Sequence, residues 1–159
     1  NVSYIPQQLF FLDDTIESNI ALNSNINEID SKHLNECIKK ARLETLIETL
    51  PLGLKTNIGE RGIKLSGGQT QRIALARAFY HGKEIIVMDE STNSLDHETE
   101  KLIMNELLAL KKTITLIMIS HRTTTLKICD RVYSIKEGSL SLSDSYKNLV
   151  NVGIIDEAK

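Results

Sequence analysis

Cysteine is scarce in this sequence, and long apolar runs are missing. Only Cys37 and Cys129 occur, far apart and without the C-x-x-C or histidine-pair spacing of a zinc site, which indicates free thiols in a reducing compartment rather than a disulfide. The longest apolar runs, such as residues 113–119, are far shorter than the roughly 20 residues that cross a bilayer. The first residues resemble neither a signal peptide nor a transit peptide. We therefore expect a cytosolic chain without a transmembrane segment.

An excess of charge of one sign is also absent. The 159 residues carry a formal net charge of −2, with acidic and basic side chains interspersed. Composition therefore gives no reason to expect a nucleic acid or an anionic membrane surface as a partner. No internal repeat or flexible linker occurs, and 41% of the residues are apolar. These features predict one globular domain, or part of one.

The apolar pattern predicts an α/β fold. Continuous apolar runs of strand length at 84–89 and 114–120 indicate parallel strands, and helical spacing at 97–111 lies between them. Other expected elements are a short strand ending at Pro6, helices at 15–22, 30–50, from about Gln69 to Phe79, and 144–153, and an edge hairpin at 131–143. We expect Asp30 or Ser31 to cap the helix over 30–50, and Ser143 or Asp144 to cap the last one.

A serine and two glycines stand directly before one of these helices. Four of the eight glycines lie within ten residues there, at positions 59, 62, 67 and 68, which concentrates backbone freedom. Unpaired N–H groups and the positive end of the helix dipole suit an anion such as phosphate. In isolation, the same Ser-Gly-Gly sequence could be only a turn with an N-cap.

Polar side chains follow both predicted parallel strands. Asp89 and Glu90 end the first strand, and Ser120 and His121 follow the second. Ligands of open α/β sheets bind at the carboxyl ends of the strands, so we expect these side chains to converge. An aspartate there can hold Mg²⁺, and a second carboxylate can orient or deprotonate water. Taken singly, two acids could instead cap the following helix, and a lone histidine could be structural.

Together and in this order, the motifs resemble the nucleotide-binding domain of exporter-type ABC transporters. "LSGGQTQRIALARAF" at 65–79, "EIIVMDESTNSLD" at 84–96 and "ISHR" at 119–122 carry the resemblance. "YIPQQLFFLDDTIESNI" at 4–20 looks like a Q-loop segment, and "LPLGLKTNIGERGIKLSGGQ" at 50–69 looks like the linker into the signature motif. The resemblance runs from the first residues to at least Gly138.

The resemblance implies a P-loop NTPase (ABC ATPase) fold with an α-helical subdomain. Residues 1–13 would form the Q-loop strand and loop, residues 14–64 the helical subdomain with its X-loop, and residues 65–159 the signature helix and the C-terminal half of the RecA-like core. No G-x-x-x-x-G-K-[ST] occurs in the sequence, so the Walker A part is expected upstream of Asn1. Without it, the parallel strands should expose apolar faces, and we expect the chain alone to be inactive.

The resemblance also implies roles for individual residues. Asp89 matches the Walker B aspartate that holds Mg²⁺ through water, and Glu90 matches the glutamate that polarises the attacking water. Gln7 matches the Q-loop glutamine, which senses Mg²⁺ and water and couples to the membrane domain. His121 matches the switch histidine, which contacts the γ-phosphate of ATP.

The remaining matches concern partner domains. Ser66 and the signature amides would bind the γ-phosphate of ATP held by a second nucleotide-binding domain in a head-to-tail dimer. Glu60 matches an X-loop acid that faces the coupling helices of the membrane domain, and Asp96 matches a D-loop acid that crosses the dimer interface. The whole signature match is Leu65, Ser66, Gly67, Gly68 and Gln69, and the D-loop match is Ser94, Leu95 and Asp96.

The resemblance therefore implies an ATP hydrolase with Mg²⁺ as cofactor, which powers export or flipping of an unknown substrate. Its membrane domain is expected to be fused upstream, and the ATPase domain to lie at the cytoplasmic face of the membrane. One alternative is a soluble ABC ATPase acting on ribosomes or DNA, but no long heptad run occurs, and "GERG" at 59–62 favours transport. A non-catalytic partner that donates only its signature motif is a further alternative, which Glu90 and His121 disfavour.

Overall fold

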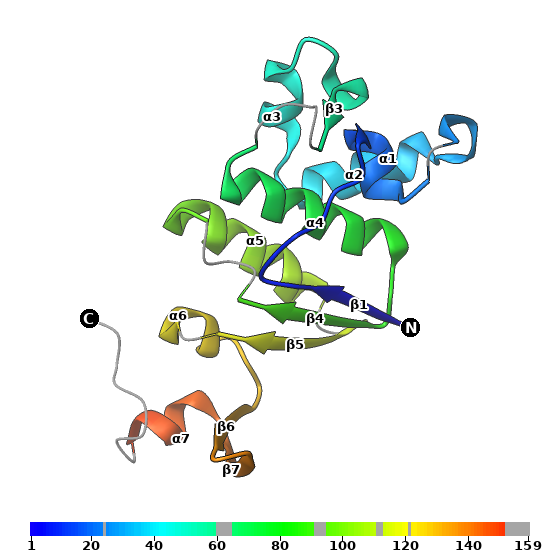
Figure 1. The fold of residues 1–159 in the computed structure, drawn as a ribbon. Coiled ribbons are helices and arrows are strands. Elements are labelled where there is room, and N and C mark those ends of the chain that lie inside the picture. Colours follow the sequence, from blue (N-terminus) through cyan, green and yellow to red (C-terminus); the bar gives the residue numbers. More distant parts are fainter. Residues whose placement is uncertain (24, 60–64, 91–94, 111–112, 121, 152–159) are drawn as a thin grey trace. The chain divides into compact units, whose positions relative to one another are not determined.

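The computed structural model describes residues 1–23, 25–59, 65–90, 95–110, 113–120 and 122–151, which form both helices and strands (Figure 1). The chain divides into two compact units, unit 1 (Asn1–Ile119) and unit 2 (Ser120–Lys159). Unit 1 contains β1 (Val2–Ile5), β2 (Asp14–Thr15), α1 (Ile16–Ala21), η1 (Ile26–Glu28), α2 (Ser31–Lys40), α3 (Glu44–Thr49), η2 (Gly53–Lys55), β3 (Asn57–Ile58), α4 (Gly67–His81), β4 (Ile85–Asp89), α5 (His97–Leu110) and β5 (Thr115–Ile119). Unit 2 contains α6 (Thr123–Leu126), β6 (Val132–Lys136), β7 (Ser139–Asp144) and α7 (Tyr146–Asn151). The predicted α/β character is confirmed.

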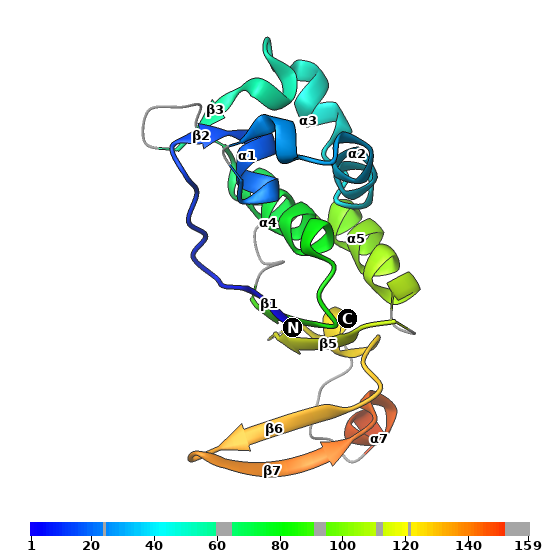
Figure 2. The same ribbon diagram turned by 90° about the vertical axis from the view of Figure 1, so that its right-hand side faces the viewer.

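A parallel sheet of three strands, in the order β1–β4–β5, supports unit 1. The helices α4 and α5 cover one of its faces (Figures 1 and 2). Ile5, Ile86 and Met88 are each 2% exposed on that covered face. The opposite face is apolar but open, because its side chains Val2, Tyr4, Ile117 and Ile119 are between 49% and 58% exposed. The expected exposure of apolar strand faces is thus present in unit 1.

The helix α4 lies between the sheet and the smaller helices α1, α2 and α3 (Figure 2). Its residues are buried around most of its circumference, including Ile73, Leu75 and three of its alanines. A helix that packs against layers on both sides has to be apolar on both sides, and alanine lets the neighbouring backbones come close. The alanine run that follows the Ser-Gly-Gly turn is therefore explained by packing.

The single helix expected over residues 30–50 is wrong, because the chain forms α2 and α3 with a break between them. Arg42 adopts the left-handed conformation with φ 56°. Ala41 and Leu43, on either side of it, are completely buried. The Arg42 carbonyl accepts a hydrogen bond of 2.7 Å from Nη1 of Arg72 on α4. Apolar periodicity continues through the break, so only the packing against α4 reveals it. The predicted cap at Asp30 is confirmed, since its side chain accepts from two backbone N–H groups of α2.

Unit 2 is built on the predicted hairpin, which forms from β6 and β7. Val132 and Tyr146 are its buried pair, with Leu126, Cys129 and Val150 packed against them. The expected cap of the last helix at Ser143 or Asp144 is wrong, because both residues belong to β7 and the Oγ of Ser145 accepts from the backbone N–H of Asn148. Both cysteines are free, as expected. No helix among the described residues is long and apolar enough to span a membrane.

Gly59 occupies a position where an added methyl group should be costly. Its φ is +123°, and a Cβ there would lie 2.9 Å from the Cα of Asp13 and 3.1 Å from the carbonyl oxygen of Leu12. We expect Gly59→Ala to lower the free energy of unfolding by about 1–3 kcal/mol for the strained backbone and about 1–3 kcal/mol more for the clash. Urea denaturation of the purified chain measures this loss.

The matched control for this substitution is Gly82→Ala. Gly82 also has a positive φ, +52°, but a Cβ there would meet nothing within 4 Å. Only the left-handed backbone is then strained, which costs about 1–2 kcal/mol. Equal losses for the two variants would contradict the clash at Gly59.

Candidate functional site

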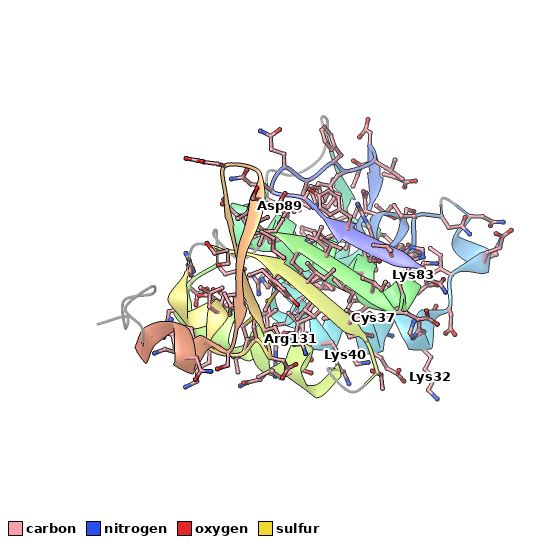
Figure 3. All side chains as sticks on the ribbon, turned by 90° about the horizontal axis from the view of Figure 1, so that it is seen from below. Lys32, Cys37, Lys40, Lys83, Asp89 and Arg131 are labelled. Carbon is pink, nitrogen blue, oxygen red and sulfur yellow. The ribbon has the colours of Figure 1, made fainter. Side chains whose placement is uncertain are left out.

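The carboxyl ends of β1 and β4 bring three of the predicted residues together. Gln7 follows β1, and Asp89 and Glu90 stand at the end of β4, so all three lie at one edge of the parallel sheet. Nε2 of Gln7 donates a hydrogen bond of 3.0 Å to Oε2 of Glu90. Figure 3 shows Asp89 at this edge and Lys83 toward the opposite end of the strands. Residues that are far apart in the sequence thus form one polar cluster.

Tyr4 is a member of this cluster that the sequence did not single out. Its hydroxyl donates a hydrogen bond of 2.9 Å to Oδ2 of Asp89. The pKa of Tyr4 is raised, mainly because of this hydrogen bond to the carboxylate. The signal in the sequence was weak, because a tyrosine in an apolar strand is ordinary. Its contact with Asp89 depends on the pairing of β1 with β4, which no local pattern reveals.

Glu90 has an unusual backbone conformation. Its φ is 48°, in the left-handed region that costs a non-glycine residue about 1–2 kcal/mol. Its N–H donates a hydrogen bond of 3.0 Å to the carbonyl of Ile119, which ends β5. The strand therefore stops at Asp89, and the chain turns so that the Glu90 carboxylate meets Gln7. Backbone strain of this kind, supported by neighbouring strands, is common at functional sites.

The alternative that Asp89 and Glu90 cap the following helix is wrong. The helix α5 begins at His97, and Oδ1 of Asp96 accepts a hydrogen bond of 2.9 Å from the N–H of Thr99 in its first turn. Hydrogen bonds from the backbone and side chain of Thr99, followed by the charge of Arg72, lower the pKa of Asp96. The capping role therefore belongs to Asp96, which the sequence motifs did not indicate.

The oxygen donors of the cluster suit Mg²⁺. Asp89 offers a carboxylate and Gln7 an amide oxygen, both hard ligands of the kind that Mg²⁺ prefers. Among the residues that the structure describes, no group of three or more histidine, cysteine, aspartate or glutamate side chains could hold a metal ion by itself. Mg²⁺ is typically held by one or two carboxylates together with water and substrate phosphates. The residues present fit an ion shared with a phosphate ligand.

The Ser-Gly-Gly turn begins α4, two residues earlier than expected. Oγ of Ser66 accepts from the N–H of Gln69 at 3.3 Å, and Oε1 of Gln69 accepts from the N–H of Ser66 at 2.7 Å, which is a capping box. The prediction that this turn caps the helix is therefore confirmed, with Ser66 as the N-cap of α4. Because Ser66 uses only its oxygen in the cap and is exposed, its hydroxyl hydrogen can still be donated. Within the described chain, no acceptor pairs with the N–H groups of Gly67 and Gly68.

Hydrogen bonds connect the loop that carries Gln7 to α4. Asn19 is fully buried, and its amide donates to the carbonyls of Leu12 and Thr15 while its oxygen accepts from the N–H of Leu12. Arg77 on α4 donates to the carbonyls of Asn19 and Phe10 at 2.8 and 3.3 Å. Burial lowers the pKa of Arg77. One network therefore ties α4, α1 and the Gln7 loop together.

Only some of the other predicted site residues lie in the part of the chain that the structure describes. Leu65 is half-buried beside the cap, and Leu95 is buried with 6% of its surface exposed. Glu60, Ser94 and His121 lie outside the described residues. The structure thus brings Gln7, Asp89 and Glu90 together, and it places Ser66 and Asp96 at helix starts.

Comparison with known proteins agrees with the motifs and the fold. The sequence pattern of the family described as "ABC transporter" matches residues 1–93. The ATP-dependent lipid A-core flippase of Pseudoalteromonas translucida is 40% identical over 146 residues, which are 92% of this chain and 25% of that protein. A "Probable ABC transporter ATP-binding/permease protein" of Haemophilus influenzae is 40% identical over 141 residues, 89% of this chain and 25% of that protein.

Among solved structures, a bacterial Atm1-family ABC exporter with ATP bound superimposes with a TM-score of 0.87 at 33% identity. The match covers 96% of this chain and 26% of that one. The chain therefore has the fold of an ABC ATPase domain, and it spans about a quarter of the length of the relatives it matches. Because the family pattern covers more than half of the chain and the structural match almost all of it, the chain belongs to the ABC transporter family.

Proposed function

We propose that this chain is part of the ATP-binding and ATP-hydrolysing domain of an exporter-type ABC transporter. The observation that carries the proposal is the hydrogen bond from Gln7 to Glu90 beside Asp89, at the carboxyl ends of β1 and β4. In this proposal Gln7 is the Q-loop glutamine, and Glu90 is the acid that follows the Walker B aspartate. The ATP-bound exporter that this chain resembles, and relatives named as flippases, support the same function.

The cluster suits an attack by water on phosphorus. Asp89 and Gln7 would hold Mg²⁺, which when bound neutralises charge on the phosphates. Glu90 would orient the attacking water and accept its proton. The amide of Gln7 donates to Glu90 and so restricts rotation of that carboxylate, which favours one position for the water. His121 would contact the γ-phosphate.

The turn before α4 would act on ATP held by a second domain. Ser66 is exposed with a hydroxyl hydrogen to donate, and the neighbouring glycine N–H groups face no acceptor within the described chain. Such groups at a helix N-terminus bind anions. Two domains would therefore close head to tail around ATP, with Asp96 crossing between them and Glu60 facing the membrane domain.

In this proposal the domain works at the cytoplasmic face of a membrane, with its transmembrane part in the same polypeptide. The relative from Haemophilus influenzae combines ATP-binding and permease in its name, and the compared exporter chain is about four times as long as this one. Its hydrolysis would drive export or flipping of a substrate. The soluble alternative, acting on ribosomes or DNA, gains no support from these relatives, of which one is named as a flippase and the other as a probable ABC transporter ATP-binding/permease protein.

The test is an assay of the complete protein in lipid vesicles. We expect ATP hydrolysis that requires Mg²⁺ and is lost in Asp89→Asn, together with a G-x-x-x-x-G-K-[ST] and several membrane-spanning stretches in the full coding sequence. Mg²⁺-dependent hydrolysis by a complete protein without membrane-spanning stretches would favour the soluble alternative. A complete protein with no G-x-x-x-x-G-K-[ST] would contradict the proposed ATPase function.

A further inference from the structure

The hydroxyl of Tyr4 reaches Asp89 because of the register of the sheet. Tyr4 on β1 pairs with Val87 on the parallel strand β4. Asp89 lies two residues beyond Val87 along β4, so its side chain is on the same face of the sheet as that of Tyr4. Such diagonal neighbours are about 7–8 Å apart, a distance that only a long side chain can bridge. The hydroxyl of Tyr4 lies 2.9 Å from Oδ2 of Asp89, within hydrogen-bond range.

The two oxygens of the Asp89 carboxylate differ in their hydrogen-bond partners. Oδ2 accepts from Tyr4, whereas no described residue donates to Oδ1. Asp89 is the last residue of β4 and directly precedes the turn at Glu90. Its side chain has a broad rotational preference about the bond to the carboxylate. A single donor on one oxygen restrains that rotation and presents the other oxygen to a ligand.

We propose that Tyr4 is a positioning residue, which orients the Asp89 carboxylate so that Oδ1 faces the Mg²⁺ of the proposed ATPase site. The inference rests on the proposed function, in which Asp89 holds the ion. Groups that bind a metal ligand from outside commonly contribute 10–100-fold to metal affinity, because they fix the ligand before the metal arrives. Tyr4 is 58% exposed, and we therefore expect an effect at the lower end of that range.

The experiment uses Mn²⁺ as a spectroscopic substitute for Mg²⁺ in the complete protein. Electron paramagnetic resonance measures free and bound Mn²⁺ in the presence of a non-hydrolysable ATP analogue, so the readout does not depend on turnover. Tyr4→Phe keeps the ring and removes the hydroxyl, and we expect it to weaken Mn²⁺ binding about 10-fold. Binding of the analogue without metal should stay as in the wild type, which also shows that the variant is folded.

The matched control is Tyr80→Phe, which removes a tyrosine hydroxyl elsewhere in unit 1. That hydroxyl accepts a hydrogen bond of 3.1 Å from the N–H of Asp30 and has no contact with Asp89. We expect this variant to bind Mn²⁺ within twofold of the wild type. An equal loss in Tyr80→Phe and Tyr4→Phe would overturn the proposal.

Asp89→Asn separates failure of this inference from failure of the proposed function. If Asp89→Asn loses Mn²⁺ binding while Tyr4→Phe keeps wild-type affinity, Tyr4 does not position the carboxylate and the proposed function stands. If Asp89→Asn binds Mn²⁺ as the wild type does, Asp89 is not a ligand and both proposals are wrong.

Discussion

Replacing Glu90 with glutamine is expected to lower ATP turnover by the complete protein by about 10²–10⁴-fold. Glutamine has nearly the same shape as glutamate but cannot accept the proton of the attacking water. The neighbouring amide of Gln7 can still pair with the oxygen of the new side chain, so the local structure should persist. ATP binding and closure of the two domains should therefore be retained. Single-turnover hydrolysis and equilibrium nucleotide binding measure the two effects separately.

Glu84→Gln is the matched control for the Glu90 substitution. Glu84 directly precedes β4 at the opposite end of the same strand, and its side chain is exposed. The same loss of one negative charge there should leave turnover within twofold of the wild type. If Glu90→Gln keeps full turnover, Glu90 does not act as the base. An equal loss in Glu84→Gln would point to net charge rather than to proton transfer.

Gly67→Asp is expected to abolish ATP-driven closure of the two domains while leaving the fold intact. Gly67 is the first residue of α4 after the cap at Ser66, where the proposed function places a γ-phosphate. A carboxylate about 5 Å from that phosphate would repel it by about 3 kcal/mol per unit charge at an effective dielectric constant of ~20. This corresponds to a loss on the order of 10²-fold in affinity for the closed state.

The helix itself should tolerate an aspartate at this position. A negative charge in the first turn stabilises a helix through its dipole, by about 0.3–1 kcal/mol. Thermal unfolding should therefore be unchanged or slightly raised in Gly67→Asp, while nucleotide-driven closure, followed by cross-linking or fluorescence, is lost. Gly67→Ala adds a side chain without charge, so the difference between the two variants isolates electrostatic repulsion. Closure in Gly67→Asp equal to that in Gly67→Ala would contradict phosphate binding at this turn.

Much of the fold followed from local patterns in the sequence. The apolar runs before Asp89 and Ser120 predicted two strands of the parallel sheet, and the cap at Asp30 and the hairpin around Gly138 were also correct. These features depend on neighbours within a few residues, such as a side chain that reaches a nearby N–H group. Local patterns failed at Arg42, where periodicity continued through a break that packing against α4 stabilises.

In the candidate site too, local patterns predicted some features and missed others. Gln7, Asp89 and Glu90 could be named from their motifs, because their residue types and order are properties of the sequence. Their mutual contacts could not, since the hydrogen bonds from Gln7 to Glu90 and from Tyr4 to Asp89 join residues 83 and 85 positions apart.

The sequence by itself determined the family, the order of the motifs and the residue types available for chemistry at the strand ends. Tertiary structure decided which of those residues touch, where the backbone of Glu90 turns, and that Asp96 rather than the strand-end acids caps α5. The physical reason is register: the pairing of β1 with β4 is set by the packing of whole strands and helices. A shift of one residue in that pairing would carry Tyr4 to the other face and away from Asp89.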